Sequence, residues 1–154
     1  MRILKKILVG AFVVFVLIQF MRPARNITSQ LLPSDISNLV PLPHRVKSLL
    51  LAACYDCHSN NTRYPWYANL QPMGWLLADH IKDGKAELNF DEFGSYSKRR
   101  QLSKLKSIGS SVKDGSMPIA SYTRMHRDAK LSAENKASII DWAIRTRDSL
   151  EIKK

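Results

Sequence analysis

Cysteine occurs only twice in this chain of 154 residues, and both copies lie in one five-residue stretch, Cys54-Tyr55-Asp56-Cys57-His58. The spacing C-x-x-C-H is the attachment motif of c-type haem. Two thiols on one turn of backbone can bond to the two vinyl groups, and the histidine that follows can reach the iron from the proximal side. Because no cysteine remains for a structural disulfide, the motif predicts one covalent haem on Cys54 and Cys57, with His58 as proximal ligand.

Two other interpretations of the motif stay open. A C-x-x-C pair also serves thiol redox chemistry in thioredoxin-like proteins, but that interpretation expects strands that alternate with helices, and none is apparent here. A structural zinc site needs four nitrogen or sulfur ligands. The other histidines, His44, His80 and His126, are scattered singly. Covalent haem is therefore favoured over a zinc or thiol-redox module.

The first 22 residues combine a basic start with an apolar run. Arg2, Lys5 and Lys6 precede residues 7–21, which carry no charge and are followed by no small-residue cleavage site. As a helix the run spans ~22 Å against ~30 Å for a bilayer core, so flanking residues would have to close the gap. We expect an uncleaved transmembrane signal-anchor at 1–22, with a cleaved signal peptide as the alternative.

The charge bias of this N-terminus places the domain outside the cytosol, so we expect an inner-membrane anchor and a periplasmic domain. The formal net charge of the whole chain is +11. Nucleic acid is a common partner of basic proteins, but no groove-reading motif is present. Haem propionates, an anionic membrane surface or an acidic redox partner protein fit the charge better, and solubility explains it equally well.

Proline separates the apolar run from the remainder of the chain. Pro23, Pro33, Pro41 and Pro43 lie in a polar stretch, which indicates an extended tether at 23–43. Residues 44–150 are then enough for one domain. The sequence therefore predicts an anchor, a tether and a single haem-binding domain.

Four segments of this domain show helical spacing of apolar residues: 44–53, 72–83, 97–113 and a last one from Ser132. Gly84 and Gly115 are expected to end the second and third helices, and Ser132 is a good N-cap. The expected buried face of the last helix is Ala137, Ile140, Ala143 and Ile144, with Trp142 nearby. No segment is a convincing strand, so the prediction is an all-α fold.

The sixth ligand of the iron is expected among the remaining methionines and histidines. Met117 lies in a Gly-x-Met-Pro loop between two predicted helices, and Pro118 restricts the residue before it to extended backbone. A gap-filling core methionine is the other interpretation of this position. His80, on the predicted second helix, is the alternative ligand. Of the remaining candidates, His126 is interpreted as a surface or structural residue, and Met73 and Met125 are interpreted as packing residues.

Four stretches carry a more specific resemblance: CYDCHSNNTRYPWY at 54–67, GWLLADHIKDGKAELNF at 74–90, GSMP at 115–118 and LSAENKASIIDWA at 131–143. Together they resemble the bacterial haem-binding domain family, small membrane-anchored proteins of Bacteroidetes-type genomes, over about residues 40 to 148. The order of C-x-x-C-H, Met-Pro and a C-terminal helix also resembles class I cytochrome c.

The resemblance implies haem on Cys54 and Cys57, a proximal His58 and a distal Met117, and it implies no defined enzymatic reaction. One departure stands out, because the family's usual Met-Pro-Pro is here Met117-Pro118-Ile119.

We therefore expect a small cytochrome c-like domain around one haem c, acting as a membrane-tethered electron carrier with His/Met-ligated iron. The alternative is a haem enzyme or a gas or redox sensor with an open or labile sixth position, such as a peroxidase-like protein. That alternative needs a distal acid–base pair, and the sequence alone places none. Arg63 is expected either to meet a haem propionate or to be a solvated loop arginine.

Overall fold

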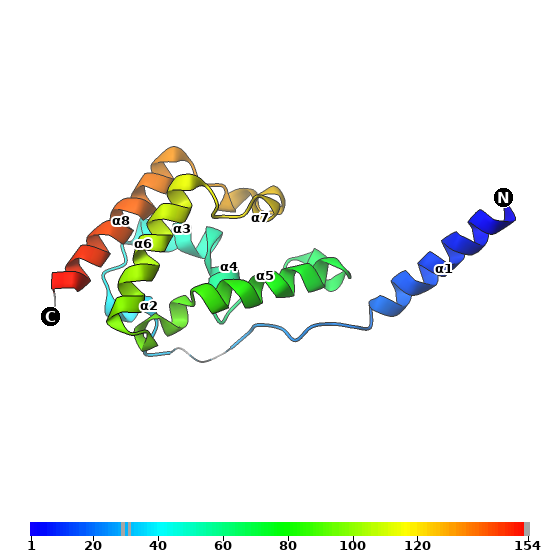
Figure 1. The fold of residues 1–154 in the computed structure, drawn as a ribbon, viewed down its shortest axis with the longest axis horizontal. Helices are drawn as coiled ribbons and strands as arrows, with labels where there is room; N and C mark the ends of the chain where they lie inside the picture. The colour runs from blue at the N-terminus through cyan, green and yellow to red at the C-terminus, as the bar shows by residue number, and fades with distance from the viewer. Residues whose placement is uncertain (29, 31, 153–154) are drawn as a thin grey trace.

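The computed structural model describes residues 1–28, 30 and 32–152, and this part of the chain contains helices and no strand (Figure 1). The α-helices are α1 (Arg2–Ile18), α2 (Ile36–Leu39), α3 (His44–Ala53), α4 (Tyr55–His58), α5 (Met73–Glu87), α6 (Lys98–Asp114), α7 (Ala120–Met125) and α8 (Ala133–Ile152). Three 3₁₀ helices join them: η1 (Trp66–Asn69), η2 (Phe90–Ser95) and η3 (Arg127–Ala129). The all-α prediction is confirmed.

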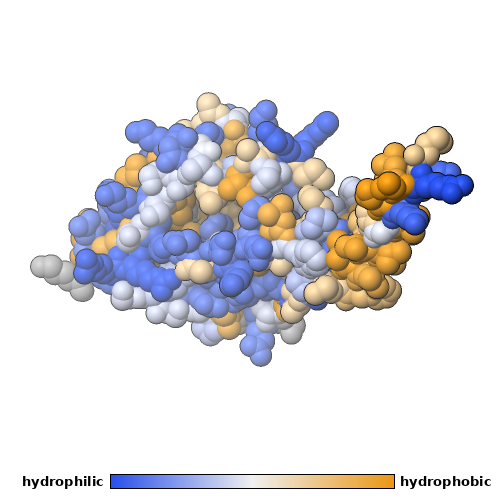
Figure 2. Space-filling model, turned by 45° about the vertical axis from the view of Figure 1, so that its right-hand side comes forward, coloured by the Kyte–Doolittle hydropathy of each residue, from blue (hydrophilic) through white to orange (hydrophobic). Residues whose placement is uncertain are grey.

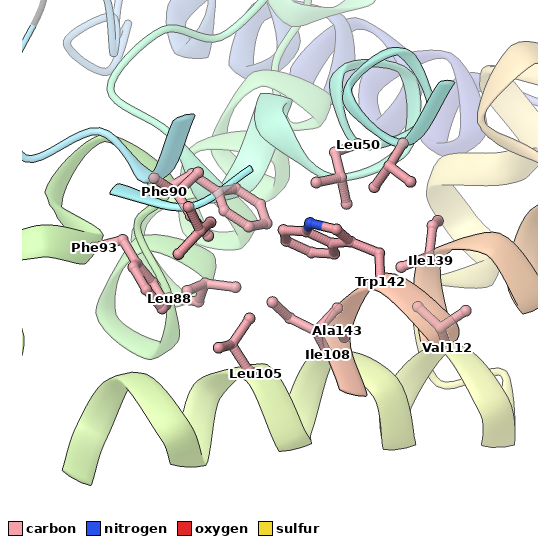
Figure 3. Close-up of a cluster of buried hydrophobic side chains, with 13 residues drawn as sticks. Leu50, Leu88, Phe90, Phe93, Leu105, Ile108, Val112, Ile139, Trp142 and Ala143 are labelled. Atoms are coloured by element: carbon pink, nitrogen blue, oxygen red, sulfur yellow. The ribbon is translucent and has the colours of Figure 1, made fainter. Parts of the chain in front are cut away.

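The hydrophobic core lies where α6 packs along α8, the most extensive helix pair in the molecule, with α3 and η2 beside them (Figures 1 and 3). Leu105 and Ile139 face each other's helix with 0% of their surface exposed, and Phe93 from η2 is equally buried. Full burial of one such side chain contributes about 1.5–3 kcal/mol. This apolar core fixes the helices from which the functional segments extend.

The ends of α6 and the start of α8 carry cap residues, of which the sequence analysis predicts Gly115 and Ser132. The side-chain oxygen of Ser97 accepts from the backbone N–H of Arg100, and Gly115 ends α6 in the left-handed region with φ of +78°. Ser132 accepts from the N–H of Asn135 at 3.1 Å. The third and fourth predicted helices are therefore confirmed within a residue or two.

The buried face of α8 differs from the expected one. Ile139, Trp142, Ala143 and Thr146 are buried, whereas Ile144 is 45% exposed. Two neighbouring faces of this helix have apolar residues at helical spacing, so the sequence alone allows either to be buried. Trp142 is the largest side chain on the helix, and its indole N–H donates to the carbonyl of Pro41 at 3.0 Å. This contact turns the face that carries Trp142 toward the core. The prediction was thus right for Ala143 and partly right for Ile140, which packs half-buried against the core, whereas Ala137 and Ile144 are exposed.

The segment 23–43, expected to be an extended tether, packs on the domain over its C-terminal part. Ile36 and Val40 are 0% and 5% exposed in the core. Asp35 caps α2 by accepting from the N–H of Ser37 at 2.7 Å, and the N–H of Gly94 donates to the Ser34 carbonyl. Residues 29 and 31 of the expected tether lie outside the described residues.

The N-terminal helix α1 extends away from the domain, and its side chains form the large orange surface in Figure 2. Its C-terminal end is tied to the domain by Gln19, which exchanges hydrogen bonds with the backbone of Gln71, and by the Trp75 indole, which donates to the Met21 carbonyl. Within the described residues, no helix has both the length and the apolar character needed to cross a membrane. The transmembrane helix expected at 1–22 is therefore not supported, since α1 has 17 residues and ends at Ile18.

Candidate functional site

The two cysteines and His58 are delivered to the domain by α3. This helix buries Val46 and Leu50 and ends at Cys54, whose N–H donates to the Leu50 carbonyl at 2.8 Å. The N–H groups of Cys57 and His58 then both donate to the Cys54 carbonyl, at 3.2 and 3.0 Å. The C-x-x-C-H stretch therefore forms one helical turn, α4, that carries both thiols and the imidazole.

The two thiols are unpaired with each other and half-buried. Burial, with the neighbouring Cys57 as the smaller cause, raises the pKa of Cys54 to about 12. Burial and the Asp56 carboxylate raise the pKa of Cys57 to about 11. Reactive redox cysteines have lowered pKa values and are thiolates near neutral pH, so this environment does not fit the thiol-redox interpretation.

His58 is held in one orientation by the main chain. Its Nδ1 lies 3.0 Å from the carbonyl oxygen of Leu88, and because a carbonyl only accepts, Nδ1 carries the proton. Burial lowers the pKa of His58, which favours the neutral imidazole. The lone pair of Nε2 is therefore available to a metal, in the arrangement that histidine ligands usually adopt, with the other ring nitrogen bound to a carbonyl or carboxylate.

Two cavities of about 190 Å³ each lie beside this turn, and Cys54, His58, Glu87 and Met117 line both of them. Together they form what we call the cleft. The first cavity is further lined by Ala53, Asp56, Cys57, His80, Asp83, Gly84, Pro118, Ile119 and Tyr122. The second is further lined by Leu88, Phe90, Lys104, Ser107, Ile108, Ser111 and Val112. The surface that lines each cavity is mainly apolar, and its small polar part comes from the polar side chains among these residues.

Met117 reaches the cleft from the loop between α6 and α7. Its N–H donates to the Ser111 carbonyl at 3.1 Å, and its side chain is 38% exposed. His80 of α5 lines the first cavity as well. The structure thus brings both of the sixth-ligand candidates proposed from the sequence to the cleft that contains His58.

The other three candidates have other surroundings. Met73 and Met125 are 40% and 49% exposed. The Nε2 of His126 is 2.8 Å from the hydroxyl of Tyr67, and its ring stacks on Tyr122. The contacts of His126 agree with the structural role expected from the sequence, whereas Met73 and Met125 are more exposed than the packing role expected of them would require.

Gly84 is a site residue that the sequence analysis misinterpreted. It was expected to end the second helix, but α5 continues to Glu87. A Cβ at this position would lie 2.6 Å from the carbonyl oxygen of Cys57 and 3.0 Å from its Cβ. Glycine therefore allows α4 to pack directly against α5. The only sequence feature that could have indicated this contact was a glycine among the regularly spaced apolar residues of a helix.

For Arg63 the sequence analysis left a haem propionate and solvent as alternatives, and the structure pairs its guanidinium with Asp56 while the side chain stays 61% exposed. Its Nε binds the Asp56 carboxylate at 3.1 Å, and its Nη2 donates to the Leu51 carbonyl. The basic group that lines the cleft is instead Lys104, whose side chain is 20% exposed and whose Nζ binds Glu87 at 3.0 Å. Lys104 belongs to α6, and the sequence analysis did not single it out.

The zinc interpretation finds no support in the part of the chain that the structure describes. No group of three or more His, Cys, Asp or Glu side chains there is arranged to hold a metal ion. A structural zinc site needs four such ligands. The cleft is lined by the imidazoles of His58 and His80 and by the thioether of Met117, which are side-chain types that can ligate haem iron.

Comparison with known proteins gives a result for the family and none for individual relatives. No curated protein and no solved structure matches the chain. The family model described as a haem-binding domain matches residues 13–145. This match spans most of the chain, including the C-x-x-C-H turn and the Met117 loop, so the chain belongs to the haem-binding domain family and binds haem.

Proposed function

We propose that the protein carries one c-type haem, bound covalently through Cys54 and Cys57, and that it transfers electrons rather than converting a substrate. One observation carries the proposal. Both thiols of a single turn, the available Nε2 of His58 and the thioether of Met117 converge on one cleft. A porphyrin needs an apolar slot with a ligand on each face, and these residues fit that requirement.

The walls of the cleft support the same assignment. Phe90, Ile108 and Val112 line its inner side, and Pro118 and Ile119 line the side near the loop. Contact with such side chains excludes water from the macrocycle, which tunes its potential. The bound haem supplies a one-electron couple, and a His/Met ligand pair raises its potential and leaves no position open to substrate.

Lys104 is the residue that we assign to a haem propionate. It lines the second cavity with Ser107 and Ser111, which add two hydroxyl donors on the same face of α6. Its ammonium already binds a carboxylate, that of Glu87, at 3.0 Å. Because Glu87 is largely exposed, its carboxylate can return to water when a propionate takes its place.

The visible spectrum of the purified protein tests the axial ligands. We expect a low-spin haem with the weak far-red charge-transfer band of Met-ligated ferric iron. Met117→Ala should keep the haem and lose that band, because the thioether bonds to the cysteines are elsewhere. His80→Ala, which alters the same cavity from α5, is the matched control and should leave the band unchanged. An unchanged band in Met117→Ala, with a high-spin His80→Ala, would instead assign the iron to two histidines.

A second function is favoured by the polar side chains of α5. His80, Asp83 and Glu87 line the first cavity, and they supply the acid–base groups that a peroxidase-like haem enzyme or a sensor requires. In that case Met117, which is 38% exposed, would be a weak or displaceable ligand. Binding of cyanide to the ferric wild-type protein within seconds, together with turnover of hydrogen peroxide that His80→Ala abolishes, would favour this second function.

The location of the domain is a proposal as well. The basic, apolar start of the chain suits export, and covalent attachment of haem suits the periplasm. We propose that α1 keeps the domain at the inner membrane, where redox partner proteins reach its basic surface. Cell fractionation with mass spectrometry of the mature N-terminus tests this, and a periplasmic protein that begins between residues 20 and 35 would contradict it.

A further inference from the structure

The side chain of Asp56 lies at the centre of a buried polar network inside the attachment turn. It is 4% exposed and stands between the two cysteines. Its Oδ1 accepts from both the backbone N–H and the Nε of Arg63, each at 3.1 Å. Its Oδ2 accepts from Nη2 of Arg63 at 3.3 Å and from the hydroxyl of Tyr122 at 2.5 Å. A buried carboxylate requires such donors in place of water.

Tyr122 brings a second segment of the chain to this turn. It is 9% exposed, lines the first cavity and belongs to α7, which begins three residues after Met117. Its hydrogen bond to Asp56 joins positions that are 66 residues apart. Hydrogen bonds to charged groups are the strong ones in proteins, so this contact holds α7 against the turn that carries both thiols.

The loop that carries Met117 is therefore fixed at both ends. On the α6 side, Gly115 turns the chain with a left-handed backbone and the Met117 N–H donates to the Ser111 carbonyl. On the α7 side, the hydroxyl of Tyr122 anchors the chain to Asp56. The Met117 side chain is itself 38% exposed, so these two contacts act together with its partial burial to fix the position of the loop.

We propose that Tyr122 is a positioning residue, whose hydrogen bond to Asp56 holds the loop so that the Met117 thioether stays on the open face of the haem. This inference rests on the proposed function, because it takes Met117 as the sixth ligand. The same contact ties the two sides of the cleft together, since Asp56 belongs to the turn that carries His58, and Tyr122 belongs to α7, which follows the Met117 loop. Loss of the hydroxyl should therefore increase the fraction of molecules in which Met117 has left the iron.

The neighbouring tyrosine provides a matched control. The hydroxyl of Tyr67 lies 2.8 Å from Nε2 of His126, whose ring stacks on Tyr122 with centroids 4.2 Å apart. Tyr67→Phe removes a hydroxyl from the same aromatic group but leaves the bond between Tyr122 and Asp56 in place. A general loosening of the aromatic packing would affect both variants, whereas the proposed role belongs to Tyr122 alone.

The experiment uses the full-length haem protein with the substitutions Tyr122→Phe, Tyr67→Phe and Asp56→Asn, and Met117→Ala for reference. Three quantities are measured: the far-red band of the ferric protein, the affinity for added imidazole and the thermal unfolding midpoint. In Tyr122→Phe we expect a weaker band and imidazole affinity raised about tenfold or more, because the apparent affinity follows the fraction of open molecules. Tyr67→Phe should stay within about twofold of the wild type by the same relation.

The outcomes separate the inference from the function on which it rests. If Met117→Ala removes the band while Tyr122→Phe keeps both band and imidazole affinity at wild-type values, the positioning role is wrong and the ligand assignment stands. If Met117→Ala leaves the band unchanged, the ligand assignment itself is wrong, and the inference is overturned with it. Asp56→Asn attacks the same bond from the other side and should reproduce the effect of Tyr122→Phe. Equal effects in Tyr67→Phe and Tyr122→Phe would also overturn the inference.

Discussion

The side of the molecule formed by α6 and α8 differs in construction from the side formed by α4, α5 and the Met117 loop. On the first side, apolar residues such as Leu105 and Ile139 are completely buried. On the second, the buried groups include the polar side chains of Asp56 and Ser59, while apolar surface lines two cavities. We call the first the α6/α8 side and the second the cleft side. The α6/α8 side is therefore stabilised by its own burial of apolar surface, whereas the cleft side needs a bound ligand to cover its surface.

The largest expected effect falls on the cleft side. The double substitution Cys54→Ala, Cys57→Ala removes both proposed thioether bonds, so no haem should remain with the protein after denaturation and acid extraction. The pyridine haemochrome spectrum of the extracted polypeptide measures this, with wild type retaining the full signal. Covalent haem at wild-type yield in the double variant would refute c-type attachment.

Leu105→Ala should clearly lower the free energy of unfolding through its effect on the α6/α8 side. Leu105 is 0% exposed between α6 and the core, and truncation of such a leucine costs about 2–5 kcal/mol in free energy of unfolding. Urea unfolding of the haem protein followed by far-ultraviolet circular dichroism measures the loss. A change below about 1 kcal/mol would show that this core is not the main source of stability.

The same substitution, glycine to alanine, should have opposite effects on stability on the two sides, and Gly84→Ala tests the cleft side. In α5 the new methyl group would lie 2.6 Å from the Cys57 carbonyl oxygen, and overpacking of this kind costs about 1–3 kcal/mol. We expect lower stability and a lower yield of attached haem, because α4 must move away from α5. Both quantities come from the absorbance and the urea unfolding of the purified protein.

The matched control for this change is Gly109→Ala in α6. No atom lies within 4 Å of a Cβ at this position, so the substitution keeps the helix and removes only the flexibility of glycine. It should raise the free energy of unfolding by about 0.5–1 kcal/mol. A Gly84→Ala protein as stable as Gly109→Ala would mean that α4 is not in close contact with α5.

The smallest effect is expected at an exposed ion pair between α3 and α8. Arg45 at the start of α3 binds Glu134 of α8 at 2.7 Å, and both side chains are more than half exposed, at 55% and 75%. Exposed ion pairs of this kind contribute about 0–1 kcal/mol. Glu134→Gln should therefore change the free energy of unfolding by less than about 1 kcal/mol in urea at moderate salt. A larger loss would show that the packing of α3 against α8 depends on this contact.

Much of the fold follows from local sequence patterns. The helix at 44–53, the N-cap Ser132 and the helix end at Gly115 all depend on neighbours within a few positions, and all were predicted. The attachment turn and the placement of Met117 and His80 beside it were also recognisable, because each depends on a motif or a helical spacing.

The features that were missed depend on contacts between distant segments. The sequence shows a glycine at position 84 but does not show that Cys57 packs against it. Two apolar stripes on α8 are equally plausible until Pro41 offers an acceptor to Trp142. The bond from Tyr122 to Asp56 spans 66 residues, and no local pattern reports a contact at that separation.

The hydrogen bond from His58 to the Leu88 carbonyl has a consequence for how the site can change over generations. The acceptor belongs to the main chain, and it follows directly after α5. A substitution at position 88 keeps this carbonyl, because every residue has one, unless the substitution changes the course of the backbone. Where a carboxylate orients a ligating histidine, one point mutation abolishes the support. Here the orientation of His58 depends on the backbone at position 88 and not on the side chain there. The side chain of residue 88 can therefore change under selection for core packing while the imidazole of His58 keeps its orientation.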